Sequence, residues 1–138
     1  SLAAALATLK KLRREDGAGQ IERAGQRIRD GYNVLAGHLA LEKVTRCVGL
    51  SPRTVVEFKG RDERESLTLK SLFQQECIRR GVLFTGYHLP SLSHGESEVD
   101  RILHVYHSAM RVLAEAVGKG DASARLEGKP VEPVFRSA

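Results

Sequence analysis

The sequence predicts an α+β domain in which helices cover a small, three-stranded, mainly antiparallel sheet. Two observations predict this fold class. Apolar residues recur at helical spacing in four segments, and three short segments between them are rich in β-branched and aromatic residues. The predicted order of elements is α-α-β-β-α-β-α. A chain of 138 residues has the length of one domain and can bury a core without metal or disulfide support.

Two helices are predicted at the N-terminal end. Leucines recur at helical spacing over residues 2–15, and glycines then interrupt the pattern. A second apolar stripe predicts a helix over residues 18–40, and the glycines inside it suggest close packing on a neighbouring element. We expect residues 1–17 to form a connecting helical arm. The leucines of this arm include Leu2, Leu6 and Leu9.

The middle of the chain predicts a hairpin, a helix and a third strand. Residues 45–49 and 54–58 are β-branched runs separated by the turn-like segment "LSPR". The charged segment "KGRDERE" follows and is predicted to be a solvated loop. A third helix is predicted over residues 66–79, where basic residues and a glycine end it, and the apolar run at residues 82–85 predicts the third strand.

The last helix has the clearest pattern. One apolar face continues over residues 97–118, and acidic side chains occupy the first turn, where they favour the positive end of the helix dipole. Two glycines end the helix. We therefore expect a small domain over residues 18–120, followed by an extended tail over residues 121–138.

Composition indicates a cytoplasmic protein with reduced thiols. Cys47 and Cys77 have no further cysteine or histidine at metal-ligand spacing. No secretory signal is visible, and no apolar run approaches the roughly 20 residues needed to span a membrane. The net charge of +5 is spread through mixed runs. Because a nucleic-acid surface usually clusters its basic residues, neither nucleic acid nor a membrane is the expected partner.

The chain does not carry a recognisable set of catalytic residues. His104 and His107 are three residues apart on the last helix, but no acidic ligand completes a metal motif beside them. There is no phosphate-binding glycine loop and no serine nucleophile motif. The lysines all lie in polar surroundings, whereas a Schiff-base lysine needs a desolvated or cation-flanked site.

The segment "RRGVLFTGYHLPSLSHGESEVDRIL" places an unusual number of polar side chains between the third strand and the last helix. These side chains could satisfy the free N–H groups of that helix, or they could form the rim of an active site. The residues concerned are Tyr87, His88, Ser91, Ser93, His94 and Gly95.

Three segments carry a resemblance to a known family. "SLAAALATLKKL", "VGLSPRTVVEF" and the polar segment above, in this order and spacing, resemble the C-terminal small domain of class III (fold-type I) pyridoxal-phosphate enzymes. The nearest branch is similar to the glutamate-1-semialdehyde 2,1-aminomutase-like aminotransferases. The resemblance implies that the loop from Gly86 to Ser91 faces a large, cofactor-bearing domain.

The resemblance also implies roles for individual residues. It implies that the substrate-side loop residues are Tyr87, His88 and Ser91. It also implies that the residues with a structural role at the helix start are Ser93, His94 and Gly95. For Ser91 and His94, capping of the last helix is the favoured role. True aminomutases have a longer loop with a glutamate, whereas Gly81 to Ser91 contains no acidic residue. This departure favours an aminotransferase over an isomerase.

The resemblance places the Schiff-base lysine, the aspartate at the pyridine nitrogen and the phosphate-binding segment in the large domain, upstream of these residues. The chain also begins without methionine, directly in a helical pattern, so we expect a fragment of a longer enzyme. Pyridoxal phosphate and a small amino or keto substrate are expected in the parent enzyme only. The isolated chain is expected to be inactive.

Two alternatives remain open from the sequence. The chain could be a free-standing interaction or dimerisation module with a basic surface, or, less favoured, a nucleic-acid-binding protein. An exposed apolar patch would support the fragment, and a continuous basic stripe would support nucleic-acid binding. We expect Leu2, Leu6 and Leu9 to be poorly covered within one chain and to be used in a homodimer.

Overall fold

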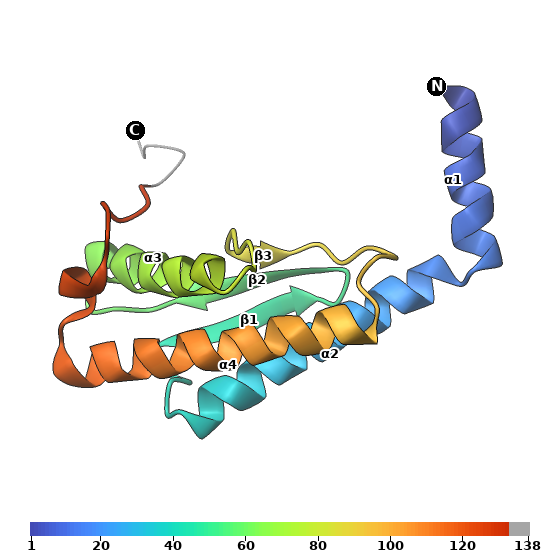
Figure 1. Ribbon diagram of the computed structural model, residues 1–138. Helices are drawn as coiled ribbons and strands as arrows, with labels where there is room; N and C mark the ends of the chain where they lie inside the picture. The colour runs from blue at the N-terminus through green and yellow to red at the C-terminus, as the bar shows by residue number, and fades with distance from the viewer. Residues whose placement is uncertain (133–138) are drawn as a thin grey trace.

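The computed structural model describes residues 1–132, and it confirms the predicted α+β fold class and order of elements (Figure 1). Four α-helices accompany one three-stranded antiparallel sheet. The elements are α1 (Leu2–Arg14), α2 (Gly17–His38), β1 (Thr45–Leu50), β2 (Arg53–Phe58), α3 (Glu63–Arg79), β3 (Tyr87–His88), α4 (Glu96–Lys119) and the 3-10 helix η1 (Ala122–Arg125).

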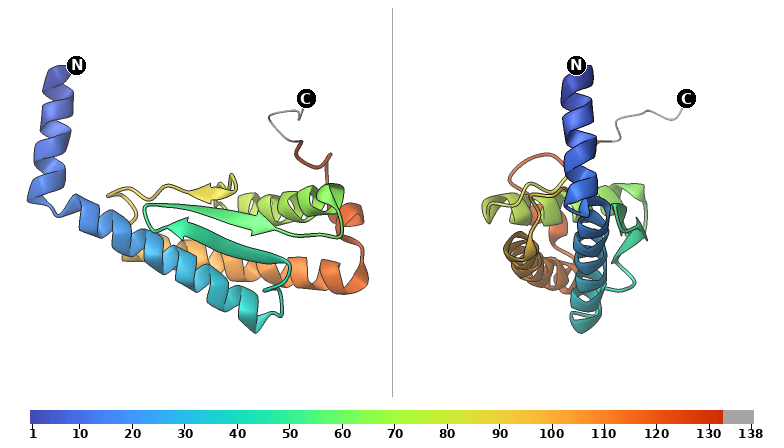
Figure 2. Two further views of the ribbon diagram at one scale, coloured as in Figure 1. Left: turned by 180° about the vertical axis from the view of Figure 1, so that it is seen from behind. Right: turned by 90° about the vertical axis from the view of Figure 1, so that its right-hand side faces the viewer.

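The sheet has helices on one face only. Its strand order is β1-β2-β3, and Val48, Val55 and Tyr87 form one row across the three strands. Along β1 and β2, buried side chains alternate with more exposed ones, which is the pattern of a sheet covered on one side. Helices α2, α3 and α4 pack against the covered face and against each other. In the view of the molecule from behind, β1 and β2 lie in front of α4 (Figure 2, left).

An aromatic cluster fills the space between the sheet and the helices. The ring of Phe73 on α3 lies at its centre, with its centroid 5.0 Å from that of Phe84 and 5.3 Å from that of Tyr106. Tyr32 on α2 meets both Phe73 and Tyr106 edge to face. Its hydroxyl donates to the Thr45 hydroxyl (2.7 Å), which in turn donates to the Glu57 carbonyl (2.8 Å). The core is thus both apolar and hydrogen-bonded.

Helix α2 approaches its neighbours closely at two glycines. A Cβ atom at Gly25 would lie 1.7 Å from the Ser51 carbonyl oxygen in the turn of the hairpin. A Cβ atom at Gly31 would lie 2.8 Å from the Leu103 side chain on α4. At Gly37, in contrast, no atom lies within 4 Å of that position. The prediction of close packing therefore holds for the first two glycines and not for the third.

Helix α3 begins three residues earlier than predicted, so part of the charged segment taken as a loop is helical. Asp62 is the N-cap, and its carboxylate accepts from the backbone N–H of Glu65 at 2.7 Å. The Glu65 carboxylate reaches back to the N–H of Arg61 at 2.5 Å. This reciprocal arrangement resembles a capping box, with Asp-x-x-Glu as its sequence signature.

The third strand was predicted at residues 82–85, and this prediction is wrong: β3 is Tyr87–His88. The reason lies in the end of α3. Gly81 has φ 82°, and the Val82 N–H donates to the Cys77 carbonyl (3.0 Å), so Val82 still belongs to the helix cap. Contact with β2 begins at Gly86, whose carbonyl accepts from the Val56 N–H at 2.9 Å.

The tail is not simply extended after residue 120, because η1 folds it back onto α3. The Gln75 side chain donates a hydrogen bond to the Arg125 carbonyl (3.0 Å) and accepts one from the Glu127 N–H (2.9 Å), and these bonds hold the returning chain on α3. The Val131 N–H donates to the Ser71 hydroxyl at 2.8 Å. The predicted extension of residues 133–138 lies outside the described residues.

Replacing Ala40 by glycine should stabilise the protein. Helix α2 ends in a Schellman motif, with Leu41 N–H bonded to the Ala36 carbonyl and Ala40 N–H to the Gly37 carbonyl. This motif puts Ala40 at φ 54°, where a Cβ atom is unfavourable. Ala40→Gly should raise the free energy of unfolding by about 0.5–1 kcal/mol in urea titrations. Gly81→Ala, at the matching position of α3, should lower it.

Helix α1 projects away from the body of the molecule at a steep angle to α2 (Figures 1 and 2). None of its residues is buried. Leu2, Leu6 and Leu9 are 92%, 53% and 64% exposed, so the prediction that they are poorly covered within one chain is confirmed. Their use in a dimer stays a prediction.

Candidate functional site

The candidate site is an extended segment, residues 82–90, between α3 and α4. Buried and exposed residues alternate along it from residue 83 to residue 90. The buried set is Phe84, Gly86, His88 and Pro90, and the exposed set is Leu83, Thr85, Tyr87 and Leu89. Only Tyr87 and His88 form ladder pairs with β2, and the chain bends at Gly86, whose φ is 103°.

Tyr87, a predicted substrate-side residue, lies on the uncovered face of the sheet. Its side chain is 49% exposed and sits beside Val55, which is 44% exposed. Leu83 and Leu89 in the same segment are 79% and 57% exposed. This placement leaves Tyr87 free to contact another molecule or domain.

His88, the second predicted substrate-side residue, points the opposite way, into the core, and is 8% exposed. Its Nδ1 lies 2.8 Å from the Thr54 hydroxyl and 3.7 Å from the Cys47 sulfur. Its Nε2 lies 2.7 Å from the Tyr106 hydroxyl. Both ring nitrogens thus have partners within the chain. Contact of His88 with a substrate stays a prediction that its burial disfavours.

The electrostatics of this network keep all its members neutral. Burial lowers the pKa of His88 to about 4, with a smaller coulombic contribution from His94. Burial also raises the pKa of the Cys47 thiol and of the Tyr106 hydroxyl. An imidazole whose pKa is this low is too weak a base to take the proton of a thiol whose pKa is raised, so His88 and Cys47 do not form a thiolate–imidazolium pair and the network supplies no nucleophile.

Ser91 and His94 do not cap α4, and the capping prediction is wrong for both. The N-cap is Gly95, which has no side chain to bond the free N–H groups of the helix. Ser91 and His94 instead bond to each other. The Ser91 N–H donates to the ring Nδ1 of His94 (3.0 Å), and the His94 N–H donates to the Ser91 carbonyl (3.0 Å).

The Ser93 N–H also donates to the Ser91 hydroxyl, at 3.3 Å. These bonds form a self-contained turn that delivers the chain to Gly95, the N-cap of α4. Ser93, His94 and Gly95 directly precede Glu96, the first residue of α4, and their structural role stays a prediction. The side chain of Ser91 is engaged within this turn, and a role toward substrate stays a prediction.

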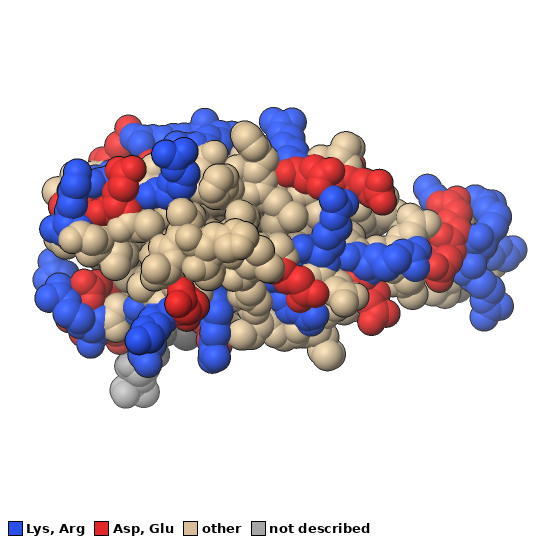
Figure 3. All heavy atoms as spheres, turned by 90° about the horizontal axis from the view of Figure 1, so that it is seen from below, with Lys and Arg blue, Asp and Glu red and all other residues tan. Residues whose placement is uncertain are grey.

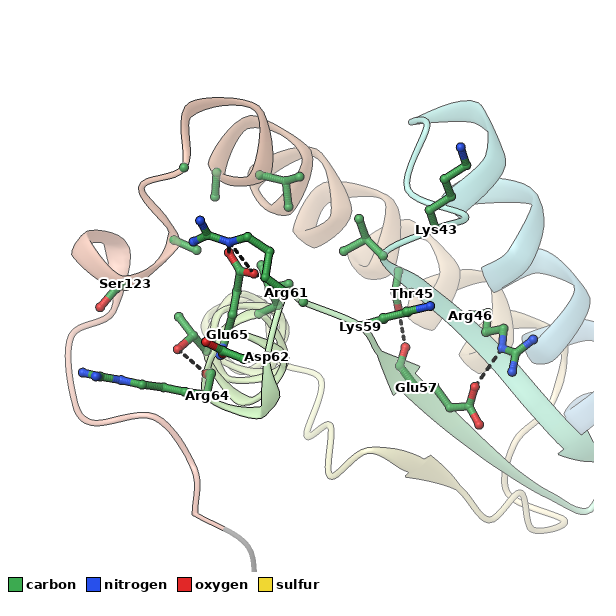
Figure 4. A pocket seen from close by; sticks show the side chains of 18 of the residues that line it. Lys43, Thr45, Arg46, Glu57, Lys59, Arg61, Asp62, Arg64, Glu65 and Ser123 are labelled. Atoms are coloured by element: carbon green, nitrogen blue, oxygen red, sulfur yellow. Dashed lines mark hydrogen bonds and ion pairs between the residues drawn. The ribbon is translucent and has the colours of Figure 1, made fainter.

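A separate open cleft of about 1150 Å³ lies at the other end of the hairpin (Figure 4). It is bounded by the start of β1, the end of β2, the start of α3 and the end of α4. Its charged side chains include the ion pairs Arg46–Glu57 (2.7 Å) and Arg61–Glu65 (3.0 Å). The sequence did not predict this cleft. Its charged lining is mostly exposed, and these two exposed ion pairs do not resemble a catalytic arrangement.

The lysines of the chain do not fit pyridoxal phosphate. None of them is buried, and Lys70 is the one that is half-buried. Lys70 lies near Gly86, where a Cβ atom would be 3.1 Å from its Nζ. A Schiff-base lysine requires a desolvated site, and no lysine here is buried. These residues by themselves therefore do not form a site for this cofactor.

Metal and membrane sites are also not apparent in residues 1–132. No three His, Cys, Asp or Glu side chains in this range are grouped as ligands, so His104 and His107 remain an isolated pair. No helix in the same range is long and apolar enough to cross a bilayer. Figure 3 shows basic and acidic side chains interspersed on the face seen from below, unlike a continuous basic stripe.

Comparison with known proteins gives matches among solved structures. No family model matches the sequence, and no curated protein matches it significantly. The FumI protein of Sphingopyxis sp. MTA144, in its pyridoxal-phosphate internal aldimine form, matches 84% of this chain with a TM-score of 0.72 and 19% identity. An omega-transaminase from Sphaerobacter thermophilus matches 69% with a TM-score of 0.62 and 13% identity.

A further structure, a transaminase with pyridoxal phosphate bound, matches 70% of the chain with a TM-score of 0.60 and 14% identity. These likenesses show a shared fold. The chain spans about a quarter of each of these proteins: 27%, 24% and 23% of their lengths respectively.

Proposed function

We propose that this chain acts as the small domain of a pyridoxal-phosphate-dependent transaminase and shapes the substrate side of its active site. The fold likeness to the FumI protein, over 84% of this chain, is the observation that carries the proposal. The order of three sequence segments that resemble the C-terminal small domain of class III enzymes supports it independently. The absence of an acidic residue from Gly81 to Ser91 favours an aminotransferase over an aminomutase.

In this proposal the cofactor-bearing lysine belongs to a large domain. The cofactor, when bound there, would act as the electron sink for the reaction. This chain would contribute orientation: Tyr87 projects from the uncovered sheet face, and the turn around Ser91 and His94 fixes the path of the loop. A small amino or keto substrate is the proposed ligand, because it is the substrate class that a transaminase handles.

The proposal is tested with the complete polypeptide encoded with this segment. We expect it to contain a lysine-bearing large domain, to show the absorbance of a bound pyridoxal phosphate and to transaminate. Tyr87→Phe should change kcat/KM for one amino substrate more than for another while the cofactor absorbance stays the same. The 138-residue chain alone should form no specific aldimine. A stoichiometric, borohydride-trapped adduct at one of its lysines would contradict the proposal.

A further inference from the structure

The backbone of Tyr87 is not itself bonded to the neighbouring strand β2. In an antiparallel pair, rows joined by backbone hydrogen bonds alternate with rows that are not joined. The Val56 N–H donates to the Gly86 carbonyl at 2.9 Å, and the next row along the strands pairs Val55 with Tyr87. The row of Tyr87 is therefore the one without backbone bonds. The residues on either side of Tyr87 set its position.

Gly86, on one side of Tyr87, does not fix the direction of the chain. Its φ is 103°, and glycine has the widest choice of backbone angles of any residue. Further upstream, Phe84 is buried in the aromatic cluster, with its ring centroid 5.0 Å from that of Phe73. Because Gly86 stands between Phe84 and Tyr87, the packing of Phe84 does not by itself determine which way Tyr87 points.

His88, on the other side of Tyr87, is held at both ring nitrogens. Its Nδ1 lies 2.8 Å from the hydroxyl of Thr54 on β2, and its Nε2 lies 2.7 Å from the hydroxyl of Tyr106 on α4. The ring and both of its partners are buried. Moving the ring would leave buried polar atoms without partners, which is costly, so the ring fixes His88 on the covered face of the sheet.

Successive residues of a strand point to opposite faces of the sheet. A side chain at position 88 that is fixed on the covered face therefore directs the side chain at position 87 to the uncovered face. We propose that His88 is a positioning residue, whose ring, clamped between Thr54 and Tyr106, holds Tyr87 toward the substrate. The role rests on the proposed transaminase function, in which Tyr87 lies on the substrate side.

The clamp makes a buried tyrosine influence substrate choice from the covered side of the sheet. Tyr106→Phe removes the hydroxyl that faces His88 Nε2 and keeps the ring that packs in the core. Tyr32→Phe is the matched control. Tyr32 is also a buried tyrosine of the aromatic cluster, but its hydroxyl bonds to Thr45 and not to His88.

Amide hydrogen exchange in the 138-residue chain measures the hold on β3 directly. The His88 amide lies in the hydrogen-bonded row with Thr54. Relative to the amides of α3, it should exchange at least about threefold faster in Tyr106→Phe than in the wild type, because the ring has lost one partner. Tyr32→Phe should leave this ratio unchanged. An unchanged ratio in Tyr106→Phe overturns the proposal.

Kinetics of the complete polypeptide with bound pyridoxal phosphate measure the effect on substrate. The probes are L-alanine and benzylamine, an amino donor with a carboxylate and one without. Tyr106→Phe should change the ratio of their kcat/KM values at least about threefold, and Tyr32→Phe should not. In a Tyr87→Ala background, Tyr106→Phe should no longer change the ratio, because the side chain that His88 positions is gone.

The outcomes separate this role from the proposed function. An active enzyme in which Tyr106→Phe leaves the ratio unchanged, or changes it equally with and without the Tyr87 side chain, overturns the positioning role and leaves the proposed function standing. A complete polypeptide that binds no cofactor overturns the proposed function, and the substrate role of His88 with it. The exchange rates then still decide whether the ring holds β3.

Discussion

Gly25→Ala is expected to lower the free energy of unfolding by at least about 3 kcal/mol, because the new methyl group has no space. It would lie 1.7 Å from the Ser51 carbonyl oxygen and 2.5 Å from the Ser51 carbonyl carbon. Both are backbone atoms of the hairpin turn and cannot rotate away. To admit the methyl group, α2 must shift from the sheet, and the Asn33 bonds to Cys47 would be strained as well.

Gly37→Ala is the matched control on the same helix. No atom lies within 4 Å of the position that its Cβ would occupy. Alanine should therefore raise the free energy of unfolding by about 0.5–1 kcal/mol through helix propensity alone. Urea titration of both variants checks the pair. Equal effects of the two substitutions would show that α2 does not approach the hairpin as closely as described.

The second large effect is a loss of stability in mild acid caused by His88. Its pKa is about 4 in the folded protein, because burial disfavours the charged ring, against an ordinary value of 6.5. Between these values the unfolded chain binds a proton that the folded chain does not, so stability rises with pH across this window. Acidification from pH 6.5 to 4 should cost on the order of 3 kcal/mol from this group.

Chemical unfolding at a series of pH values measures this effect. His88→Gln removes the titrating ring, so the variant should lose this part of the pH dependence, although it should be less stable at neutral pH because Thr54 and Tyr106 lose their partner. His104→Gln, at an exposed histidine of α4, is the control and should retain the wild-type slope. Parallel curves for the wild type and His88→Gln would contradict the assignment.

The sequence predicted the elements whose signals are local. The turn "LSPR" between two β-branched runs was sufficient to predict the hairpin, and the apolar stripe of α4 was sufficient to predict that helix. The early start of α3 was also local, because Asp62 and Glu65 form a capping signature that the reading of a charged loop overlooked.

The environment of His88 could not be predicted locally. In the sequence it stands among Tyr, Pro and Ser, as a loop residue would. Its inward orientation follows from pairing with Thr54, and its second partner, Tyr106, comes from α4. Both contacts join residues far apart in the sequence. Apolar and polar residues do not alternate from Phe84 to Pro90, and the alternation of buried and exposed residues there belongs to the folded structure.

The absence of buried residues in α1 has a thermodynamic consequence for anything that binds it. Tertiary packing adds little to its stability, and an isolated helix of 13 residues is marginal in water. We therefore expect α1 to exchange between helix and coil in the free chain. A ligand that recognises the helix binds only the molecules in which α1 is helical. Its apparent affinity is therefore the intrinsic affinity multiplied by the helical fraction. Substitutions that raise the helicity of α1 would tighten such binding without touching the ligand.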